Sequence, residues 1–330
     1  MQTGALITLA LYFVGMLAIG FYAWRKSTDS SEGYLLGGRQ LSPAVAALSA
    51  GASDMSGWLL LGLPGALYAA GLVEVWIGIG LFLGALANWI VVAPRLREQT
   101  ERLGNALTIP EFLANRFPDK ALALRVTSAI IIVLFFAVYT AAGLVGGGKL
   151  FETSFAGLFG DTGMSDYMTG IWMTAGVVLA YTMVGGFLAV SLTDFVQGCI
   201  MVVALVLMPL VVMFGPGGAS GESILAITQP GYLSLTYGLT AVGFLSAVAW
   251  GLGYFGQPHI IVRFMAIRSV AQVPKARNIG MSWMGVALLG AVGVGIAGRA
   301  YVERNGLVLD DPETIFIMLA NTLFHPLITG

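Results

Sequence analysis

Charged residues are scarce in this sequence. Asp, Glu, Lys and Arg make up 10% of its 330 residues, against about 25% in a typical soluble domain. Hydrophobic residues make up 57%, and the mean hydropathy is +0.86. The deficit of charge excludes a soluble protein and predicts an integral membrane protein. The net charge of -1 says nothing about nucleic acid, but the sequence has no basic stripe to hold phosphates, so we expect no nucleic-acid partner.

Cysteine and histidine are nearly absent. The single cysteine, Cys199, excludes an internal disulfide and a cysteine-based metal site, and we interpret it as a small buried apolar residue. His259 has no second histidine or carboxylate at metal-ligand spacing, so we interpret it as a satisfied polar residue. No nucleophile–base pair is recognisable. The sequence therefore predicts neither an enzyme nor a cofactor.

Long apolar runs dominate the sequence. A helix needs about 20 residues to cross a bilayer core, and the segments that qualify are 3–24, 43–68, 73–93, 125–148, 166–185, 188–214, 236–256 and 277–300. The first has no charged n-region and is long enough to span, which favours a retained span over a cleavable signal. A last apolar stretch, 314–330, is interpreted as an outer loop helix or the start of a ninth span.

The basic residues orient these spans. With the N-terminus outside, the cytoplasmic loops contain 13 of the 16 Lys and Arg residues, as the positive-inside rule requires. These are Arg25, Lys26, Arg39, Arg95, Arg97, Arg102, Arg116, Lys120, Arg125, Arg263, Arg268, Lys275 and Arg277. We therefore expect a multi-pass membrane protein with its N-terminus outside.

Two loops carry their own signals. In the cytoplasmic loop 94–124, Thr108 and Glu111 have the spacing of a capping box and Pro110 lies in the first turn, so we expect a short interfacial helix. The outer loop GPGGASGESILAITQPGY is rich in Gly, Pro and Ser, which favours irregular structure.

Asp54 is a carboxylate within the second apolar segment. Such a charge at mid-bilayer costs about 3 kcal/mol and usually faces a cavity or an ion path; a structural hydrogen bond between helices is the alternative. Serines flank it, and Gly51 and Gly57 weaken the helix. These features predict a discontinuous helix, whose freed carbonyls can bind a cation.

The seventh segment is interrupted too. In SAVAWGLGYFGQPHI three glycines weaken the helix and Pro258 breaks it, next to Trp250 and Tyr254. The letters GLGYFG match G-x-G-x-x-G, but no strand or βαβ unit surrounds them, which excludes a dinucleotide site. Asp194, near the start of the sixth segment, is either a functional carboxylate or one stabilised by the helix dipole.

The two interrupted segments are five spans apart. Because five is odd, they cross the membrane in opposite directions, which is the geometry of an inverted repeat with its site where the broken helices meet. The pattern predicts an all-α polytopic secondary transporter. Serines and carbonyls beside Asp54 suit a hard cation, and the aromatic residues suit a small organic solute.

Three stretches carry a resemblance to a known family: GGRQLSPAVAALSAGASDMSGWLLLGLPGA, GGFLAVSLTDFVQ and WGLGYFGQPHIIVRFMA. They resemble the sodium/solute symporter family, and the resemblance covers essentially the whole chain. It implies a single membrane domain, 1–330, with a core of two inverted five-helix repeats. Residues 3–24 would form an extra N-terminal span, 43–214 the first repeat and 236–330 the start of an incomplete second repeat.

The resemblance also implies roles for individual residues. Ala52 and Met55 would bind sodium through their backbone carbonyls, and Asp54 would be needed for sodium coupling. Arg39 and Asp194 would act in coupling and sodium release on the cytoplasmic side. The residues implied in proline binding are Ser56, Gly57, Trp58, Tyr139, Trp250, Tyr254 and Pro258.

Together these expectations describe sodium-coupled uptake of L-proline through the bacterial inner (plasma) membrane, with sodium and L-proline as ligands. Symport of pantothenate or another amino acid, and a sensor or channel on the same fold, are the alternatives. The family's further sodium ligands, a Ser/Thr pair on the third helix of the second repeat, would lie beyond Gly330. We therefore expect the sequence to be the N-terminal portion of a longer carrier.

Overall fold

Every named element is a helix in the part of the chain that the computed structural model describes, residues 2–27, 29–155, 157, 163–215 and 217–329. The elements up to residue 154 are α1 (Gln2–Ser27), α2 (Ser31–Leu36), η1 (Gly37–Arg39), α3 (Pro43–Met55), η2 (Ser56–Leu59), α4 (Gly62–Ala70), η3 (Leu72–Glu74), α5 (Val75–Val91), α6 (Ala93–Arg102), α7 (Ile109–Arg116), η4 (Pro118–Lys120) and α8 (Ala121–Ser154), where η denotes a 3-10 helix. The later elements are α9 (Asp166–Phe214), α10 (Gly221–Leu225), α11 (Ala241–Ala249), η5 (Trp250–Phe255), α12 (Pro258–Ala266), η6 (Val270–Gln272), α13 (Val273–Arg304), η7 (Pro312–Thr314), α14 (Ile315–Leu323) and α15 (Pro326–Thr329).

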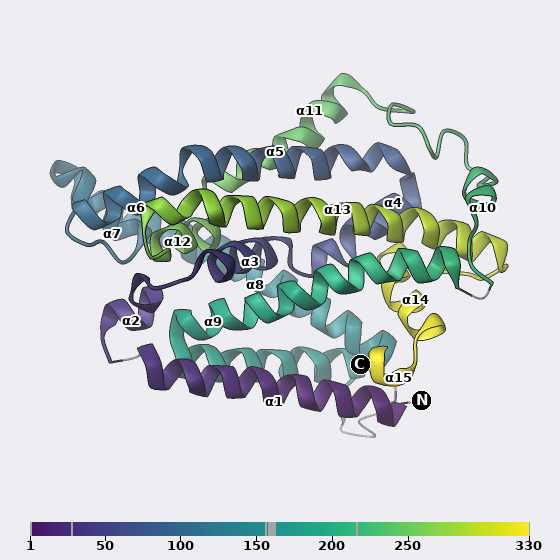
Figure 1. Ribbon diagram of the computed structural model, residues 1–330, viewed down its shortest axis with the longest axis horizontal. Helices are drawn as coiled ribbons and strands as arrows, with labels where there is room; N and C mark the ends of the chain where they lie inside the picture. Colours follow the sequence, from purple (N-terminus) through teal and green to yellow (C-terminus); the bar gives the residue numbers. More distant parts are fainter. Residues whose placement is uncertain (1, 28, 156, 158–162, 216, 330) are drawn as a thin grey trace.

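Several of these helices can cross a membrane. Among the described residues five are long and apolar enough, Gly4–Lys26, Leu72–Arg102, Pro118–Ser154, Asp166–Phe214 and Val270–Arg304, and α3 with α4 adds a span bent by 44°. The 49 residues of α9 are more than twice the number that one crossing needs, about 20. The helix reverses at Gly186 (φ 59°, ψ -153°), so its two antiparallel arms correspond to the fifth and sixth predicted spans (Figure 1).

Both predicted breaks are present. In the second span, α3 ends at Met55, Ser56 adopts φ 41° and ψ -148°, and α4 begins at Gly62. In the seventh span, the 3-10 segment η5 separates α11 from α12. This span is longer than the predicted segment 236–256, because Pro258 is favourable at the start of a helix and α12 continues to Ala266.

The loop 94–124 contains the expected short helix. Thr108 caps α7 by accepting the Glu111 N–H at 3.3 Å, and the Glu111 carboxylate accepts the Leu107 N–H at 2.8 Å. The third span does not end at residue 93 as expected, because Pro94 lies in the first turn of α6 and the helix continues to Arg102. The outer loop has only the short helix α10 among its described residues, and Pro216 lies outside them.

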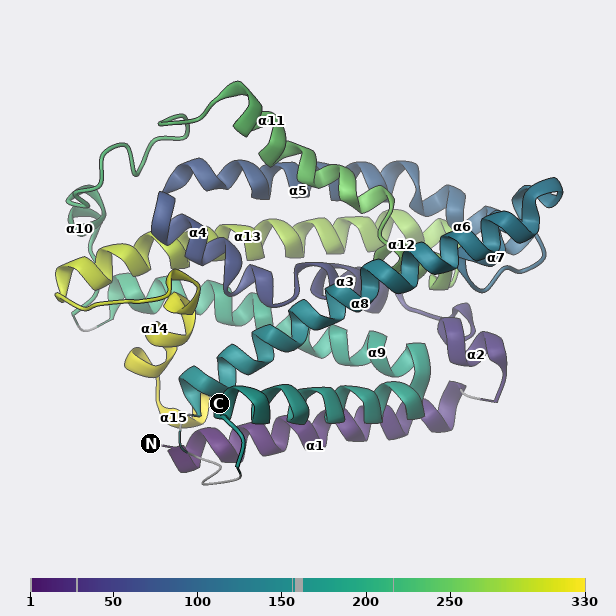
Figure 2. The same ribbon diagram turned by 180° about the vertical axis from the view of Figure 1, so that it is seen from behind.

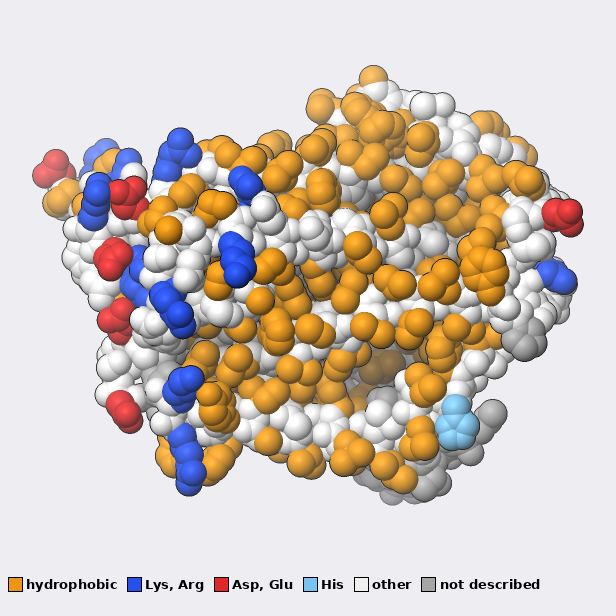
Figure 3. All heavy atoms as spheres, in the orientation of Figure 1, with side chains coloured by type: hydrophobic (Ala, Val, Ile, Leu, Met, Phe, Trp, Pro, Cys, Tyr) orange, Lys and Arg blue, Asp and Glu red, His pale blue; other side chains and the backbone are white. Residues whose placement is uncertain are grey.

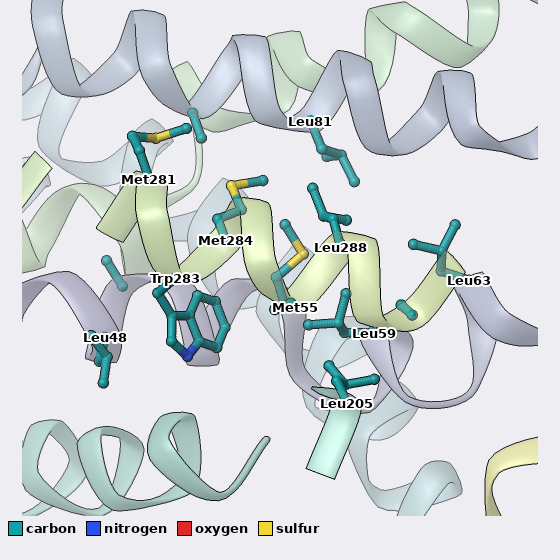
Figure 4. Packing of buried hydrophobic residues seen from close by; sticks show 14 of the residues in the cluster. Leu48, Met55, Leu59, Leu63, Leu81, Leu205, Met281, Trp283, Met284 and Leu288 are labelled. Carbon is teal, nitrogen blue, oxygen red and sulfur yellow. The ribbon is translucent and has the colours of Figure 1, made fainter. Parts of the chain in front are cut away.

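The core lies where α13 crosses the broken spans. Trp283 of α13 lies against Gly51 of α3, where a Cβ atom would come within 2.7 Å of the indole ring. Its Nε1 donates to the Gly198 carbonyl of α9 over 2.8 Å. Figure 4 shows Trp283 next to Leu48, with Met284 on the side of α13 that faces α5. One long helix therefore holds α3, α5 and α9 in register.

The molecule has two distinct ends. Helices α2, α6, α7 and α12 lie at one end, and α10, α14 and α15 lie at the other (Figures 1 and 2). Lys and Arg side chains gather at the first end, while hydrophobic side chains cover most of the middle (Figure 3). An apolar middle between polar ends suits a bilayer. Cys199 is exposed, so the prediction that it is buried was wrong; a small, weakly polar thiol is compatible with an apolar surrounding.

Candidate functional site

The two broken spans meet at Asp54 and Tyr254. Tyr254 lies on η5, and its hydroxyl donates a hydrogen bond to Oδ2 of Asp54, near the end of α3. Tyr254 is 4% exposed. Within the described residues no Lys or Arg forms an ion pair with Asp54. The bond engages only one carboxylate oxygen, so Oδ1 can face a cation.

Helix α5 holds the unwound segment in position. A Cβ atom at Gly84 would lie 2.1 Å from the Gly251 carbonyl oxygen, and one at Gly251 would lie 2.1 Å from the Gly80 carbonyl oxygen. Only glycine permits this contact between backbones. Asn88, fully buried on α5, donates from Nδ2 to the Tyr254 carbonyl over 2.9 Å. The sequence analysis missed Asn88, although an amide in an apolar span is a recognisable signal.

A buried ion pair between α9 and α12 packs against α3, next to the two serines that precede Asp54, Ser49 and Ser53. Arg263 of α12 donates from Nη2 to Asp194 Oδ2 of α9 over 2.7 Å. Ser49 accepts from Arg263 Nε at 2.7 Å and donates to Asp194 at 2.8 Å, and Ser53 accepts from Arg263 Nη2 at 2.7 Å. These serines therefore serve the ion pair, which ties α3, α9 and α12 together.

The ion pair corrects two sequence interpretations. Asp194 lies two turns beyond the reversal at Gly186, where the helix dipole no longer acts, so it is not a helix-terminal carboxylate. Arg263 is 3% exposed and is not a residue of the cytoplasmic loop. In the sequence, a charged residue just after an apolar run resembles a loop residue. Only a helix that continues after Pro258 would have indicated that Arg263 is buried.

An aromatic group from α8 borders the same region. The Tyr139 hydroxyl donates to the Ser53 carbonyl, and the Tyr139 ring centre lies 5.0 Å from that of His259. The Phe136 ring centre lies 5.1 Å from that of His259 and 5.4 Å from that of Tyr139, so the three rings pack against one another. Both ring nitrogens of His259 are buried without a hydrogen-bond partner among the described residues. Among the described residues His259 is therefore surrounded by aromatic rings and not by protein hydrogen-bond partners.

The expected sodium ligands lie at the end of α3. The Ala52 carbonyl accepts the N–H of Ser56, and Met55 is 2% exposed. A carbonyl oxygen has two lone pairs, so this bond leaves Ala52 able to bind a cation. Across the part of the chain that is described, no three His, Cys, Asp or Glu side chains converge as a metal site.

The remaining solute candidates spread around the break. The Trp58 ring packs against Gly62, where a Cβ atom would come within 2.5 Å of it. Gly57 is exposed, and no atom lies within 4 Å of the position of a Cβ there. Trp250 is 57% exposed. The structure thus brings Asp54 and Tyr254 together and leaves Trp250 on an open side of the break.

Arg39 lies away from Asp54, at the end of the molecule where the basic residues gather. It is 4% exposed and donates to the carbonyls of Met265 at 2.8 Å and Ala106 at 2.9 Å. Arg97 of α6, equally buried, donates to the Ile267 carbonyl at 2.5 Å. Both arginines therefore satisfy carbonyl groups at the C-terminal end of α12.

Comparisons with known proteins identify relatives of this chain. A family model described as the sodium:solute symporter family matches residues 34–330. The high-affinity proline transporter PutP of Bacillus subtilis (strain 168) is 55% identical over 317 residues, which cover 96% of this chain and 65% of that protein. The sodium/proline symporter of Staphylococcus aureus (strain JH9) is 51% identical over 324 residues, which cover 98% of this chain and 62% of that protein. The chain thus spans less than two thirds of the length of these relatives.

A solved structure has a similar fold. It is a Na+-coupled sialic acid symporter in a substrate-bound outward-open state, with a TM-score of 0.79 and 19% sequence identity. The match covers 99% of this chain and 68% of that one. At this identity the similarity concerns the fold alone.

Proposed function

Because this chain belongs to the sodium:solute symporter family, we propose that it forms the ligand-binding part of a carrier that takes up L-proline together with sodium. The names of the two relatives, a proline transporter and a sodium/proline symporter, support proline as the solute. The observation that carries the proposal is the bond between Tyr254 and Asp54. It joins a carboxylate that can attract a cation to an aromatic residue of the other broken span.

Sodium would bind between Asp54 and the carbonyls of Ala52 and Met55. Tyr254 holds the carboxylate through Oδ2, so Oδ1 is oriented before the ion arrives and less ordering is needed on binding. Proline would bind beside the same tyrosine. An ion that orders Asp54 also orders Tyr254, which lowers the cost of binding the solute. Coupling of this kind is typically about 1 to 3 kcal/mol and is reciprocal.

The solute pocket would be formed on both sides of the two breaks. Tyr139 and Trp250 would contact the pyrrolidine ring, since aromatic walls suit a compact apolar body. Ser56, Gly57 and Trp58 would border the pocket from η2, and Pro258 would border it at the start of α12. This mechanism needs no covalent step, because the sodium gradient supplies the work.

We extend the proposal to topology. The basic end of the molecule (Figure 3) would face the cytoplasm and the N-terminus would lie outside the plasma membrane. Residues 3–24 would precede the repeats, 43–214 would form the first and 236–330 would open the second. Arg39 and the Asp194–Arg263 pair would then lie on the cytoplasmic side of Asp54, where sodium leaves.

Uptake of radiolabelled proline by the full-length gene product, in cells without their own proline carriers, tests the proposal. We expect uptake to require sodium and to resist a large excess of pantothenate or of other amino acids. Uptake that is equal in sodium and in potassium, or stronger competition by pantothenate than by unlabelled proline, would contradict it. A sensor on the same fold would bind proline without accumulating it.

A further inference from the structure

Asn88 has a hydrogen-bond acceptor that the rest of the site does not use. It is fully buried, and Oδ1 has no partner among the described residues. The orientation of the amide follows from chemistry, because the Tyr254 carbonyl can only accept and must face the NH2 group. Oδ1 therefore points away from Tyr254 and lacks a donor.

A small cavity lies beside Asn88. Its volume is about 20 Å³, and Asn88 and Tyr254 are among the residues that line it. One water needs about 10 to 15 Å³ and two to four polar partners. Buried acceptors without a protein donor are usually satisfied by water. The cavity has room for one water and is too small for an organic solute.

Two further polar atoms border the cavity. A Cβ atom at Gly280 would lie 3.7 Å from both Trp89 Nε1 and the Ala47 carbonyl oxygen, and all three residues line the cavity. A water there can accept from the indole N–H and donate to Asn88 Oδ1 and to the Ala47 carbonyl. A metal cation is disfavoured, because the indole N–H presents positive charge to it.

We propose that Asn88 binds one internal water in this cavity and, through its NH2 group, positions the unwound segment so that Tyr254 reaches Asp54. The water satisfies Oδ1 and thereby keeps the NH2 group turned toward the Tyr254 carbonyl. Asn88 is a positioning residue, since it acts through the backbone of Tyr254. The positioning role rests on the proposed function, whereas the water does not.

The water is tested by filling its cavity. Gly280→Ala places a methyl group where the nearest atoms lie 3.5 to 3.7 Å away, so it fits without a clash. Gly285→Ala is the matched control, because it lies on the same helix and would meet only Phe82, at 3.5 Å. Both changes improve helix propensity, but only the first displaces the water and leaves Oδ1 unsatisfied.

Thermal unfolding of the purified full-length gene product in detergent gives the answer. We expect Gly285→Ala to raise the unfolding midpoint by about 1 to 3 °C and Gly280→Ala to lower it by about 2 to 4 °C. If the cavity were an empty void, filling it would stabilise the protein. If the midpoint rises at least as much for Gly280→Ala as for Gly285→Ala, the proposal that the cavity holds a water is wrong.

The positioning role is tested by the sodium dependence of the same midpoint. Asn88→Leu keeps the branching at Cγ but has no donor, and we expect it to raise the sodium concentration for half-maximal stabilisation about fivefold. If Asn88 had a purely structural role, Asn88→Leu would lower the unfolding midpoint without sodium and leave this sodium concentration unchanged. That result would contradict the positioning role. If sodium does not stabilise the wild type at all, the positioning role and the proposed function are both wrong. The comparison of Gly280→Ala with Gly285→Ala still tests whether the cavity holds a water.

Discussion

Tyr254 and Asp54 are 200 residues apart in the sequence, and a hydrogen bond from the tyrosine hydroxyl to the carboxylate joins them. The bond connects the break of the second span with the break of the seventh. Arg263 of α12 bonds to Ser49 of α3 and to Asp194 of α9. Any movement of α12 relative to α3 must therefore rearrange a small and defined set of polar contacts.

We predict that the Asp194–Arg263 pair stabilises the fold only as a pair. Arg263→Met leaves a buried carboxylate without its cation, which typically costs about 3 to 5 kcal/mol. The double variant Asp194→Leu with Arg263→Met removes both charges and should lose less stability than Arg263→Met alone. Thermal unfolding in detergent measures both.

Arg268→Met is the control for this prediction, because Arg268 is exposed and, among the described residues, its side chain bonds only to Gln40. It should change stability by less than about 0.5 kcal/mol. A double variant that is less stable than either single variant would show that the charges do not depend on each other.

We predict that Arg97 keeps the C-terminal end of α12 closed. Its guanidinium bonds to the carbonyls of Ile267 and Arg268, and hydrogen bonds to a charged group contribute about 1.5 to 3 kcal/mol each. In a Cys199→Ser background, Arg97→Gln should raise the rate at which a membrane-impermeant maleimide labels Ile267→Cys from the cytoplasmic side by about tenfold or more.

Arg95→Gln is the matched control for Arg97. It lies on the same helix but is exposed, and it bonds only to the Val91 carbonyl of the adjoining helix α5. Equal labelling rates in the two variants would mean that Arg97 does not hold this end of α12.

Much of the fold could be predicted because the bilayer imposes it. Spans appear as apolar runs whatever their neighbours are, and glycine and proline marked both breaks before any contact was known. The capping box at Thr108 is equally local, and it was confirmed. The apolar runs singled out Asp54 as a carboxylate inside a span, and the interrupted seventh segment contained Tyr254, but no local pattern indicated that the two side chains touch.

The contacts that depend on distant partners could not be predicted. Arg263 is functionally interpretable only because Asp194 lies opposite it, 69 residues away in the sequence. Asn88 needs the carbonyl of Tyr254, and the environment of His259 depends on a helix more than a hundred residues earlier. Burial of a polar side chain follows from tertiary packing, which the hydropathy of its own segment does not report.

We predict that Trp250 contributes to solute binding and little to stability. Its side chain is 57% exposed, so Trp250→Ala removes little packing. It should raise the proline concentration for half-maximal uptake about tenfold, since loss of an aromatic contact costs about 1 to 1.5 kcal/mol, and should change the sodium value less. Trp172→Ala, at a 62% exposed tryptophan of α9, is the control and should change neither. Equal changes in the two concentrations would contradict the assignment.

We predict that an outer ion pair persists to low pH. Asp311 accepts from Lys149 Nζ at 3.0 Å. Burial acts to raise the pKa of the Asp311 carboxyl, but hydrogen bonds from Lys149 and from the Glu313 N–H outweigh it, and the pKa lies below the ordinary 3.8. A carboxyl group whose pKa is lowered by folding stabilises the fold at a pH above its pKa in the unfolded state. That contribution is lost as the pH falls through its pKa in the folded state.

A spin label at Val308→Cys, an 85% exposed position, reports this contact in a Cys199→Ser background. Its mobility should stay constant from about pH 8 to about pH 5 and rise only below about pH 4. Lys149→Met should make the label mobile at every pH. A rise in the wild type between about pH 7 and about pH 5 would contradict the prediction.

The sodium concentration for half-maximal proline uptake, compared between wild type, Asp54→Asn and Tyr254→Phe in the full-length gene product, tests the central claim most directly. Asp54→Asn keeps the shape but removes the charge that attracts sodium, so it should raise this concentration more than about tenfold or abolish uptake. Tyr254→Phe keeps the charge and loses one hydrogen bond, so the rise should be about three- to fivefold. Unchanged sodium dependence in Asp54→Asn would contradict the account.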